Sequence, residues 1–145
     1  MERAYNIAAG IIGAIIGFLF GEITGAFIAL VALMIIDYIT GMIKAYAKKE
    51  LSSSAGFRGI ARKVVILCLV AVAHLIDEYV LKTGAIAMGA TTAFYIGNEG
   101  LSILENAADI GIPLPQVLLS ALKQIRKKGE EDKESKEKTE ENKNG

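Results

Sequence analysis

The feature that most constrains the fold is an apolar run from Ala4 to Ile36, in which Glu22 is the single charged residue. A membrane-crossing helix needs about 20 mostly apolar residues, because the hydrocarbon core is roughly 30 Å thick and a helix rises about 1.5 Å per residue. The run is too long for one such helix. Residues 21–25 carry two glycines around Glu22 and offer a natural turn. We therefore expect two helices, over 4–20 and 25–47.

Two more apolar runs follow, over 64–81 and 83–104. Together the runs predict an all-α integral membrane protein with about four transmembrane helices. The first helix is short and rich in glycine, so a re-entrant or interfacial arm is an alternative that leaves three spans. A cleaved signal peptide fits less well, because Glu2 offsets the charge of Arg3 and no small-residue cleavage site follows before the next apolar run.

The carboxyl end has a different composition. Residues 123–145 carry 15 charges, whereas the preceding 122 residues carry 17. After a transmembrane domain over 1–110, the prolines at 113 and 115 stop the last helix. We expect an amphipathic membrane-surface helix over 111–128, whose apolar stripe is Leu118, Leu119, Leu122 and Ile125. Residues 129–145 have no core-forming side chain, so we expect a disordered charged tail.

Basic residues indicate the orientation, because cytoplasmic loops carry an excess of Lys and Arg. The connection over 44–63 holds six basic residues against one acid, Glu50, and the turn over 21–25 holds no basic residue. This connection and the tail are therefore expected in the cytoplasm. Four spans then place the amino terminus in the cytoplasm as well.

Polar side chains interrupt two of the predicted spans. Asp37 lies in the second, and Asn98 and Glu99 lie in the fourth. An acid at the centre of a span costs about 2.5–3.5 kcal/mol, so it usually faces a partner or water. The alternating directions of the spans place these acids in the cytoplasmic half. One interpretation is a structural ion-pair set with Arg62, Lys63 or Lys44, and the other is the lining of an aqueous path.

His74 lies three residues before Asp77, on the same helical face near the outer end of the third span. The pattern favours a hydrogen-bonded packing histidine over a proton relay. The candidate pore or ion-pair residues are therefore Asp37, Lys44, Arg62, Lys63, His74, Asp77, Asn98 and Glu99.

Small residues recur at every fourth position in two series, and such spacing lets helices approach closely in a bilayer. One series crosses the first turn and the other lies on the last span. The candidate packing residues are Gly13, Gly17, Gly21, Gly25, Gly89, Ala93 and Gly97. The spacing fits both packing within one chain and self-association.

No pattern for catalysis or cofactor binding is present in the sequence. Cys68 and His74 are the single cysteine and the single histidine, so thiol or metal chemistry lacks partners. The serines at 52–54 suit a loop and a helix cap, since no base stands at a recognisable spacing. We expect no enzyme activity, catalytic residue, metal or cofactor, and no nucleic-acid partner.

The residues that break the apolar runs resemble four blocks of one family. Residues 37–45, DYITGMIKA, resemble the D-Y-x-T-G-x-x-K-A signature of the phage lysis and toxin-secretion holins of Gram-positive bacteria and their phages. Residues 53–63 resemble the S-S-x-x-G-x-x-G-x-x-x-K block of this family, and residues 70–77 its third-span pattern. Residues 98–106, followed by 111–115, are similar to its most distinctive block. The resemblance covers roughly residues 30–118.

The resemblance implies a holin, which oligomerises in the bacterial cytoplasmic membrane and opens non-selective lesions. An endolysin or a toxin leaves through these lesions without contacting a binding site on the holin. The implied partners are the lipid bilayer, further copies of the chain and, as an alternative, an antiholin. Two other functions stay open: a small ion channel or transporter, and an antiholin-like membrane regulator.

Overall fold

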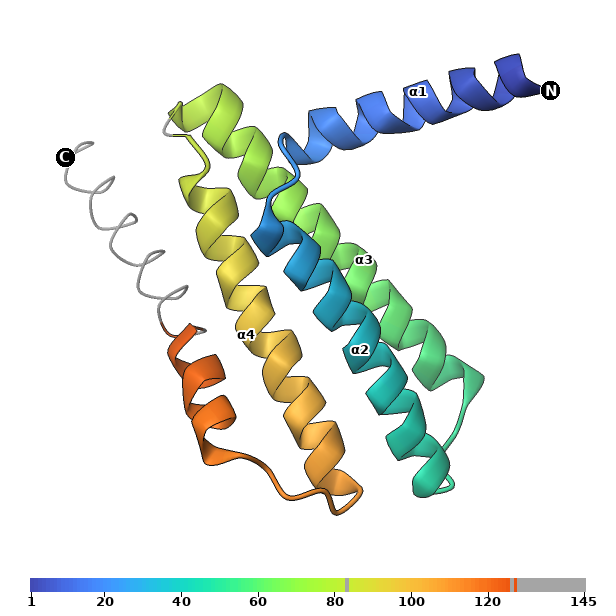
Figure 1. Cartoon of the computed structure of the whole chain (residues 1–145), viewed down its shortest axis with the longest axis vertical. Coiled ribbons are helices and arrows are strands. Elements are labelled where there is room, and N and C mark those ends of the chain that lie inside the picture. Colours follow the sequence, from blue (N-terminus) through green and yellow to red (C-terminus); the bar gives the residue numbers. More distant parts are fainter. Residues whose placement is uncertain (83, 126, 128–145) are drawn as a thin grey trace.

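The structure is a computed structural model that describes residues 1–82, 84–125 and 127. In this part of the chain it contains helices and no strands: α1 (Glu2–Phe20), α2 (Gly25–Ala47), α3 (Ser53–Leu75), the π-helical turn η1 (Ile76–Leu81) and α4 (Ile86–Asp109). Helices α2, α3 and α4 lie side by side as a bundle, and α1 projects away from it (Figure 1). The sequence therefore predicts the helical class correctly. The tail over 129–145, with its expected disorder, lies outside the described residues.

Hydroxyl caps define where two of the bundle helices begin. The Thr24 side chain accepts a hydrogen bond from the Phe27 amide at 3.2 Å, and that of Ser52 accepts one from the Ala55 amide at 3.2 Å. Such caps satisfy amides that the first turn of a helix leaves free. Helix α3 thus begins well before the apolar run at residue 64, so the basic residues of the 53–63 block are helical rather than in a loop.

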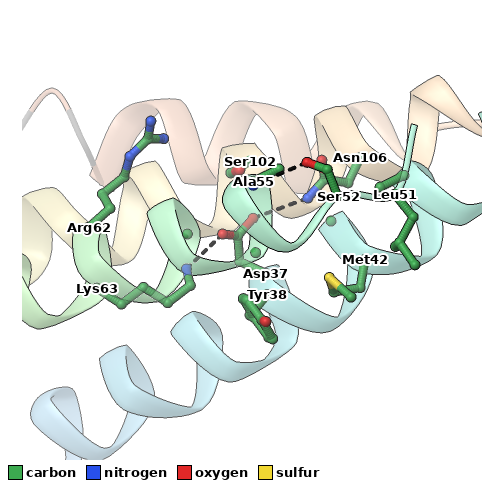
Figure 2. Close-up of a pocket in the computed structure, with 14 residues that line it drawn as sticks. Asp37, Tyr38, Met42, Leu51, Ser52, Ala55, Arg62, Lys63, Ser102 and Asn106 are labelled. Carbon is green, nitrogen blue, oxygen red and sulfur yellow. Dashed lines mark hydrogen bonds and ion pairs between the residues drawn. The ribbon is translucent and has the colours of Figure 1, made fainter.

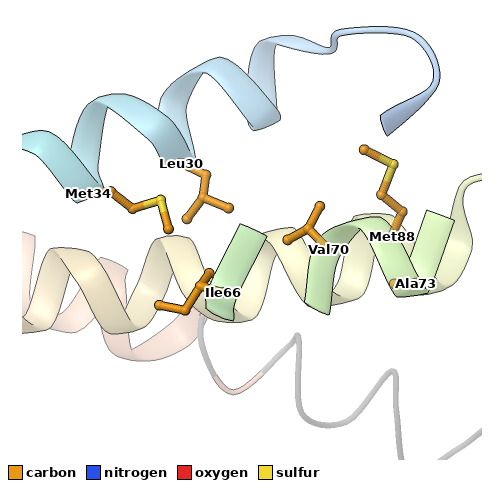
Figure 3. Close-up of a cluster of buried hydrophobic side chains, with 6 residues drawn as sticks. All are labelled: Leu30, Met34, Ile66, Val70, Ala73 and Met88. Atoms are coloured by element: carbon orange, nitrogen blue, oxygen red, sulfur yellow. The ribbon is translucent and has the colours of Figure 1, made fainter. Parts of the chain in front are cut away.

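An apolar cluster holds the three bundle helices together in the half of the bundle near the α1–α2 turn. Its buried members are Leu30 and Met34 from α2, Ile66, Val70 and Ala73 from α3, and Met88 from α4 (Figure 3). Phe20 and Phe27 pack beside this cluster with their ring centroids 4.8 Å apart. The axis of the bundle is therefore filled by hydrocarbon at this end.

Three helices among the described residues are long and apolar enough to cross a membrane: α1, α2 and the continuous segment Ser53–Leu81. Helix α4, which contains most of the predicted fourth span, is not one of them. It is the most buried helix of the bundle and turns polar side chains inward, among them Thr91, Thr92 and Glu99. These polar residues lower the mean hydropathy of α4 below that of a typical membrane-spanning helix.

Helix α1 has no buried residue along its 19 positions. It contacts the rest of the chain near its carboxyl end, where the rings of Phe18 and Tyr79 lie 6.2 Å apart. The chain then turns at Gly21, whose φ of 62° is a conformation that glycine adopts readily. The imidazole of His74 packs so closely on this turn that a Cβ atom at Gly21 would lie 2.5 Å from it.

Residues 116–125 form a further helix, which follows Gly111 and the two prolines. We expected its leucine stripe to face the membrane surface. Instead, Leu122 packs against Gly100 of α4, where an added Cβ atom would lie 2.6 Å from a leucine methyl carbon. Leu119 and Leu122 are half-buried, whereas Leu118 and Ile125 are exposed. An apolar stripe fits a helix groove as well as it fits lipid, and Leu122 packs in such a groove.

Candidate functional site

The centre of the site is a lysine that bridges two acids across three helices. The Nζ atom of Lys63 on α3 donates to Oδ2 of Asp37 on α2 at 2.7 Å and to Oε2 of Glu99 on α4 at 2.5 Å. These side chains are 15%, 17% and 7% exposed, respectively. A buried charge is tolerated where it is paired and hydrogen-bonded. This ion-pair triad therefore links the bundle helices to one another at a single point.

Asn106 extends the triad along α4. Its side-chain amide donates to Oδ1 of Asp37 at 3.1 Å and to the Thr40 hydroxyl at 3.2 Å. The Thr40 hydroxyl in turn donates to the backbone carbonyl of Asp37 at 3.0 Å. Both oxygens of the Asp37 carboxylate thus accept hydrogen bonds. The two carboxylates face one ammonium group, and the neutral Asn106 amide adds a further donor to Asp37.

Thr40 and Asn106 were not among the predicted site residues. Helical spacing gives a signal for each, because Thr40 lies one turn after Asp37 and Asn106 lies two turns after Glu99. A polar residue at these spacings shares a helical face with a buried acid.

A cavity of about 210 Å³ opens beside the triad between α2, α3 and α4 (Figure 2). Asp37, Lys63 and Asn106 contribute polar atoms to its wall. Small residues on α3 border it, and two of them face Tyr38: Gly56 lies beside its hydroxyl group and Gly59 beside its ring. The buried charges therefore lie next to space that water can enter.

The other predicted basic residues have different positions. Lys44 pairs with Asp109 at 2.5 Å, and Lys48 lies 3.5 Å from the same carboxylate, so these residues join the adjoining ends of α2 and α4. Arg62 is exposed and makes no ion pair with any described residue. Of the three candidate basic partners for the buried acids, the structure brings Lys63 to them and places Arg62 and Lys44 elsewhere.

Asp77 lies at the opposite end of the bundle. It is 2% exposed, and its two carboxylate oxygens accept hydrogen bonds from the amides of Ala87 at 3.0 Å and Met88 at 2.8 Å. A carboxylate at a helix amino terminus satisfies free amides and suits the helix dipole. Asp77 thus anchors the start of α4, and His74, one turn earlier, packs on the Gly21 turn.

The remaining predicted residues fall into two groups. Asn98 is half-buried beside a second cavity, and Gly97 and Ala93 lie within the packed part of α4. In contrast, Gly13, Gly17, Gly25 and Gly89 have no atom within 4 Å of the position where a Cβ would stand. The first small-residue series is therefore used within the chain mainly at Gly21. Among the described residues, no group of three or more His, Cys, Asp or Glu side chains is arranged to hold a metal ion.

Comparison with known proteins identifies the family of the chain. The model of the bacteriophage holin family matches residues 14–127. A probable holin of Bacillus phage phi105 is 46% identical over 105 residues, which cover 72% of this chain and 76% of the phage protein. An uncharacterized protein of Halalkalibacterium halodurans is 39% identical over 137 residues, or 92% of this chain and 100% of the relative. An uncharacterized protein of Listeria monocytogenes is 43% identical over 126 residues, which cover 87% of this chain and 89% of the relative. No solved structure matches the chain.

Proposed function

The chain belongs to the bacteriophage holin family, and on this premise we propose that it associates in the bacterial cytoplasmic membrane and opens non-selective lesions. An endolysin, or a toxin, passes through these lesions. The family expected from the four sequence blocks is thus confirmed, and the chain is a multi-pass helical membrane protein. The work of such a protein is a change in association state, and no substrate is turned over.

The observation that carries the proposal is that, in the described bundle, apolar side chains pack the axis closed at the end away from the triad, although Thr91 and Thr92 also turn inward there. The polar residues of the triad occupy one end, and the other end is filled by the cluster that contains Leu30, Val70 and Met88. A selective channel or transporter needs polar groups through the whole depth of the membrane. The closed axis instead favours a lesion that forms between copies.

Helix α1 supports association between copies. It is long and apolar enough to cross a membrane, yet it buries no residue against its own bundle. Its Gly13 and Gly17 positions are uncovered. Helices in lipid associate through small residues that let backbones approach, so α1 offers this face to a neighbouring copy.

We propose four spans with both termini in the cytoplasm. The basic residues near Lys48 and Lys63 mark the cytoplasmic end of α2 and α3. Helix α4 then returns across the bilayer with its polar residues shielded by α2 and α3. If α1 lies in the interface instead of crossing, three spans remain and the amino terminus lies on the outer side.

The triad has a role in this change of state. While the bundle is closed, Asp37 and Glu99 are neutralised in part by Lys63. When copies rearrange around a lesion, the acids become exposed to water, where ionised groups are strongly favoured over a low-dielectric interior. The buried acids therefore favour the open assembly.

Inducible expression with a cytoplasmic endolysin tests the proposal, with the endolysin alone as the control. We expect accumulation without harm, then abrupt arrest of growth and release of folded proteins of graded size. Release of small ions alone would contradict the proposal in favour of a channel. Neither arrest nor lysis, together with delayed lysis by a second holin, would identify an antiholin-like regulator.

A further inference from the structure

Two cavities join along the side of the bundle where α3 and α4 meet. The first has a volume of about 440 Å³ and begins near Arg62 and Glu105. The second, of about 240 Å³, ends near Ile76 and Ala87. Leu69 and Tyr95 border both, so the two cavities adjoin along the seam between α3 and α4, which we call the seam groove.

The seam groove is of mixed polarity in its larger cavity, near Arg62, and apolar in the smaller one, toward Ile76, and the described chain leaves its α3 side exposed. On α3 and the start of η1 the wall consists of residues three or four positions apart that are between 38% and 56% exposed: Val65, Leu69, Val72 and Ile76. From Arg62 to Ile76 the helix rises about 21 Å at about 1.5 Å per residue. One leaflet of a hydrocarbon core is about 15 Å deep. The groove is therefore long enough for one acyl chain.

The cytoplasmic end of the seam groove is polar and carries charges of both signs. Arg62 lies on the α3 wall and Glu105 on the α4 wall, with Asn98 and Ser102 nearby on α4. Both charged side chains are exposed, and neither makes an ion pair with a described residue. The acid behind them, Glu99, already pairs with Lys63. One cation and one anion therefore remain to meet a ligand from opposite walls.

We propose that the seam groove binds a zwitterionic phospholipid that carries a phosphate and an amine. The phosphate contacts Arg62, since a guanidinium group matches phosphate oxygens in charge and geometry. The ammonium group contacts Glu105, and an acyl chain lies along Leu69 and Val72 toward Ile76. An anionic headgroup without an amine would leave Glu105 unpaired and be repelled by it. The proposal depends on the proposed passage of α3 and α4 across the bilayer.

The test measures lipid retained by the full-length protein in detergent, using native mass spectrometry. Phosphatidylethanolamine and phosphatidylglycerol with identical acyl chains serve as the two probes. We expect preferential retention of one phosphatidylethanolamine per chain. Arg62→Gln should lower its retention at least about tenfold, a change of about 1.4 kcal/mol. Glu105→Gln should abolish the preference over phosphatidylglycerol.

The charge swap Arg62→Glu with Glu105→Arg keeps the zwitterionic match and should restore retention. Arg58→Gln, an exposed arginine on α3 outside the groove, serves as the matched control. Equal retention of both lipids by the native protein, or no loss in Arg62→Gln, would overturn the proposal. Occupation of the groove by a second copy of the chain would also overturn the proposal. The double variant Leu69→Cys, Cys68→Ser would then form a disulfide-linked dimer through the new cysteine. Lysis is measured separately, so failure of lipid binding stays distinct from failure of the holin function.

Discussion

The ammonium group of Lys63 on α3 lies 2.5 Å from a carboxylate oxygen of Glu99 on α4, where 7% of the glutamate side chain is exposed. The same ammonium group also contacts Asp37. Lys63 is thus the single described cation that contacts both Asp37 and Glu99, and we expect the stability of the bundle to depend on it more than on any exposed charge.

Lys63→Met should destabilise the bundle by about 3–5 kcal/mol, because it leaves the buried Glu99 and the half-buried Asp37 carboxylates without their cation. Thermal unfolding in detergent and accumulation in membranes measure the effect. Arg58→Met, an exposed change on the same helix, should alter stability by about 0.5 kcal/mol or less. Equal unfolding temperatures for the two variants would contradict the role of the triad.

Glu99→Gln should delay lysis severalfold while leaving accumulation nearly unchanged. The amide keeps a hydrogen-bonding group beside Lys63, and Asp37 still neutralises that lysine, so the closed bundle loses about 1–2 kcal/mol at most. The open assembly loses an ionised group that water would stabilise. Asp37→Asn should act in the same direction.

For both Glu99→Gln and Asp37→Asn, the time of lysis and the size of the oligomer are measured at matched protein levels. Glu78→Gln, an exposed acid in η1 outside the triad, is the control. Unchanged timing in both triad variants would show that the acids do not contribute to opening.

Asp77→Ala should loosen the start of α4 by about 1–2 kcal/mol, since the amides of Ala87 and Met88 lose a carboxylate acceptor. Hydrogen exchange at these two amides should rise, while exchange near Asn106 stays unchanged. Asp77→Asn should keep part of the protection, because its amide oxygen still accepts. Equal exchange at the two amides in the native protein and Asp77→Ala would rule out the cap.

Gly100→Ala should displace the helix over 116–125, because the new methyl group would lie 2.6 Å from Leu122. Gly89→Ala is the matched change on the same helix, with nothing within 4 Å, and should be neutral or stabilising by up to about 1 kcal/mol. Trypsin cleavage after Lys123 in detergent measures the release of this helix. Cleavage at the same rate in both variants would refute the packing of Leu122 on Gly100.

The sequence predicts Asp37 and Glu99 at one level, because the expected alternating spans place both acids in the same half of the membrane, and in the structure both acids contact Lys63. It could not select Lys63 over Arg62. Adjacent helical residues point about 100° apart, and the rotation of α3 is fixed by packing of residues such as Ile66 and Val70. The start of α3 at Ser53 also differs from the apolar run, since a helix can extend beyond the hydrocarbon core through polar residues.

The contact of Leu122 with Gly100 could not be predicted from the sequence either. A leucine stripe backed by basic residues has the same pattern whether it faces lipid or another helix. What decides between them is the missing side chain at Gly100, on a surface that forms after α4 has packed. Residues 116–125 are helical and Leu122 packs on Gly100, whereas the placement of this helix on the cytoplasmic membrane surface stays a prediction.

The pairing of Glu99 with a lysine 36 positions earlier has a consequence for biosynthesis. During translation, α2 and α3 leave the ribosome before α4, so the cation has entered the membrane before the acid arrives. Helix α4 is not among the described helices that are long and apolar enough to span a membrane by themselves, unlike the segment Ser53–Leu81 before it, so it should enter the bilayer most readily beside a preformed partner. We therefore expect insertion of the last helix to depend on the third, and a nascent chain without Lys63 to fail at this step.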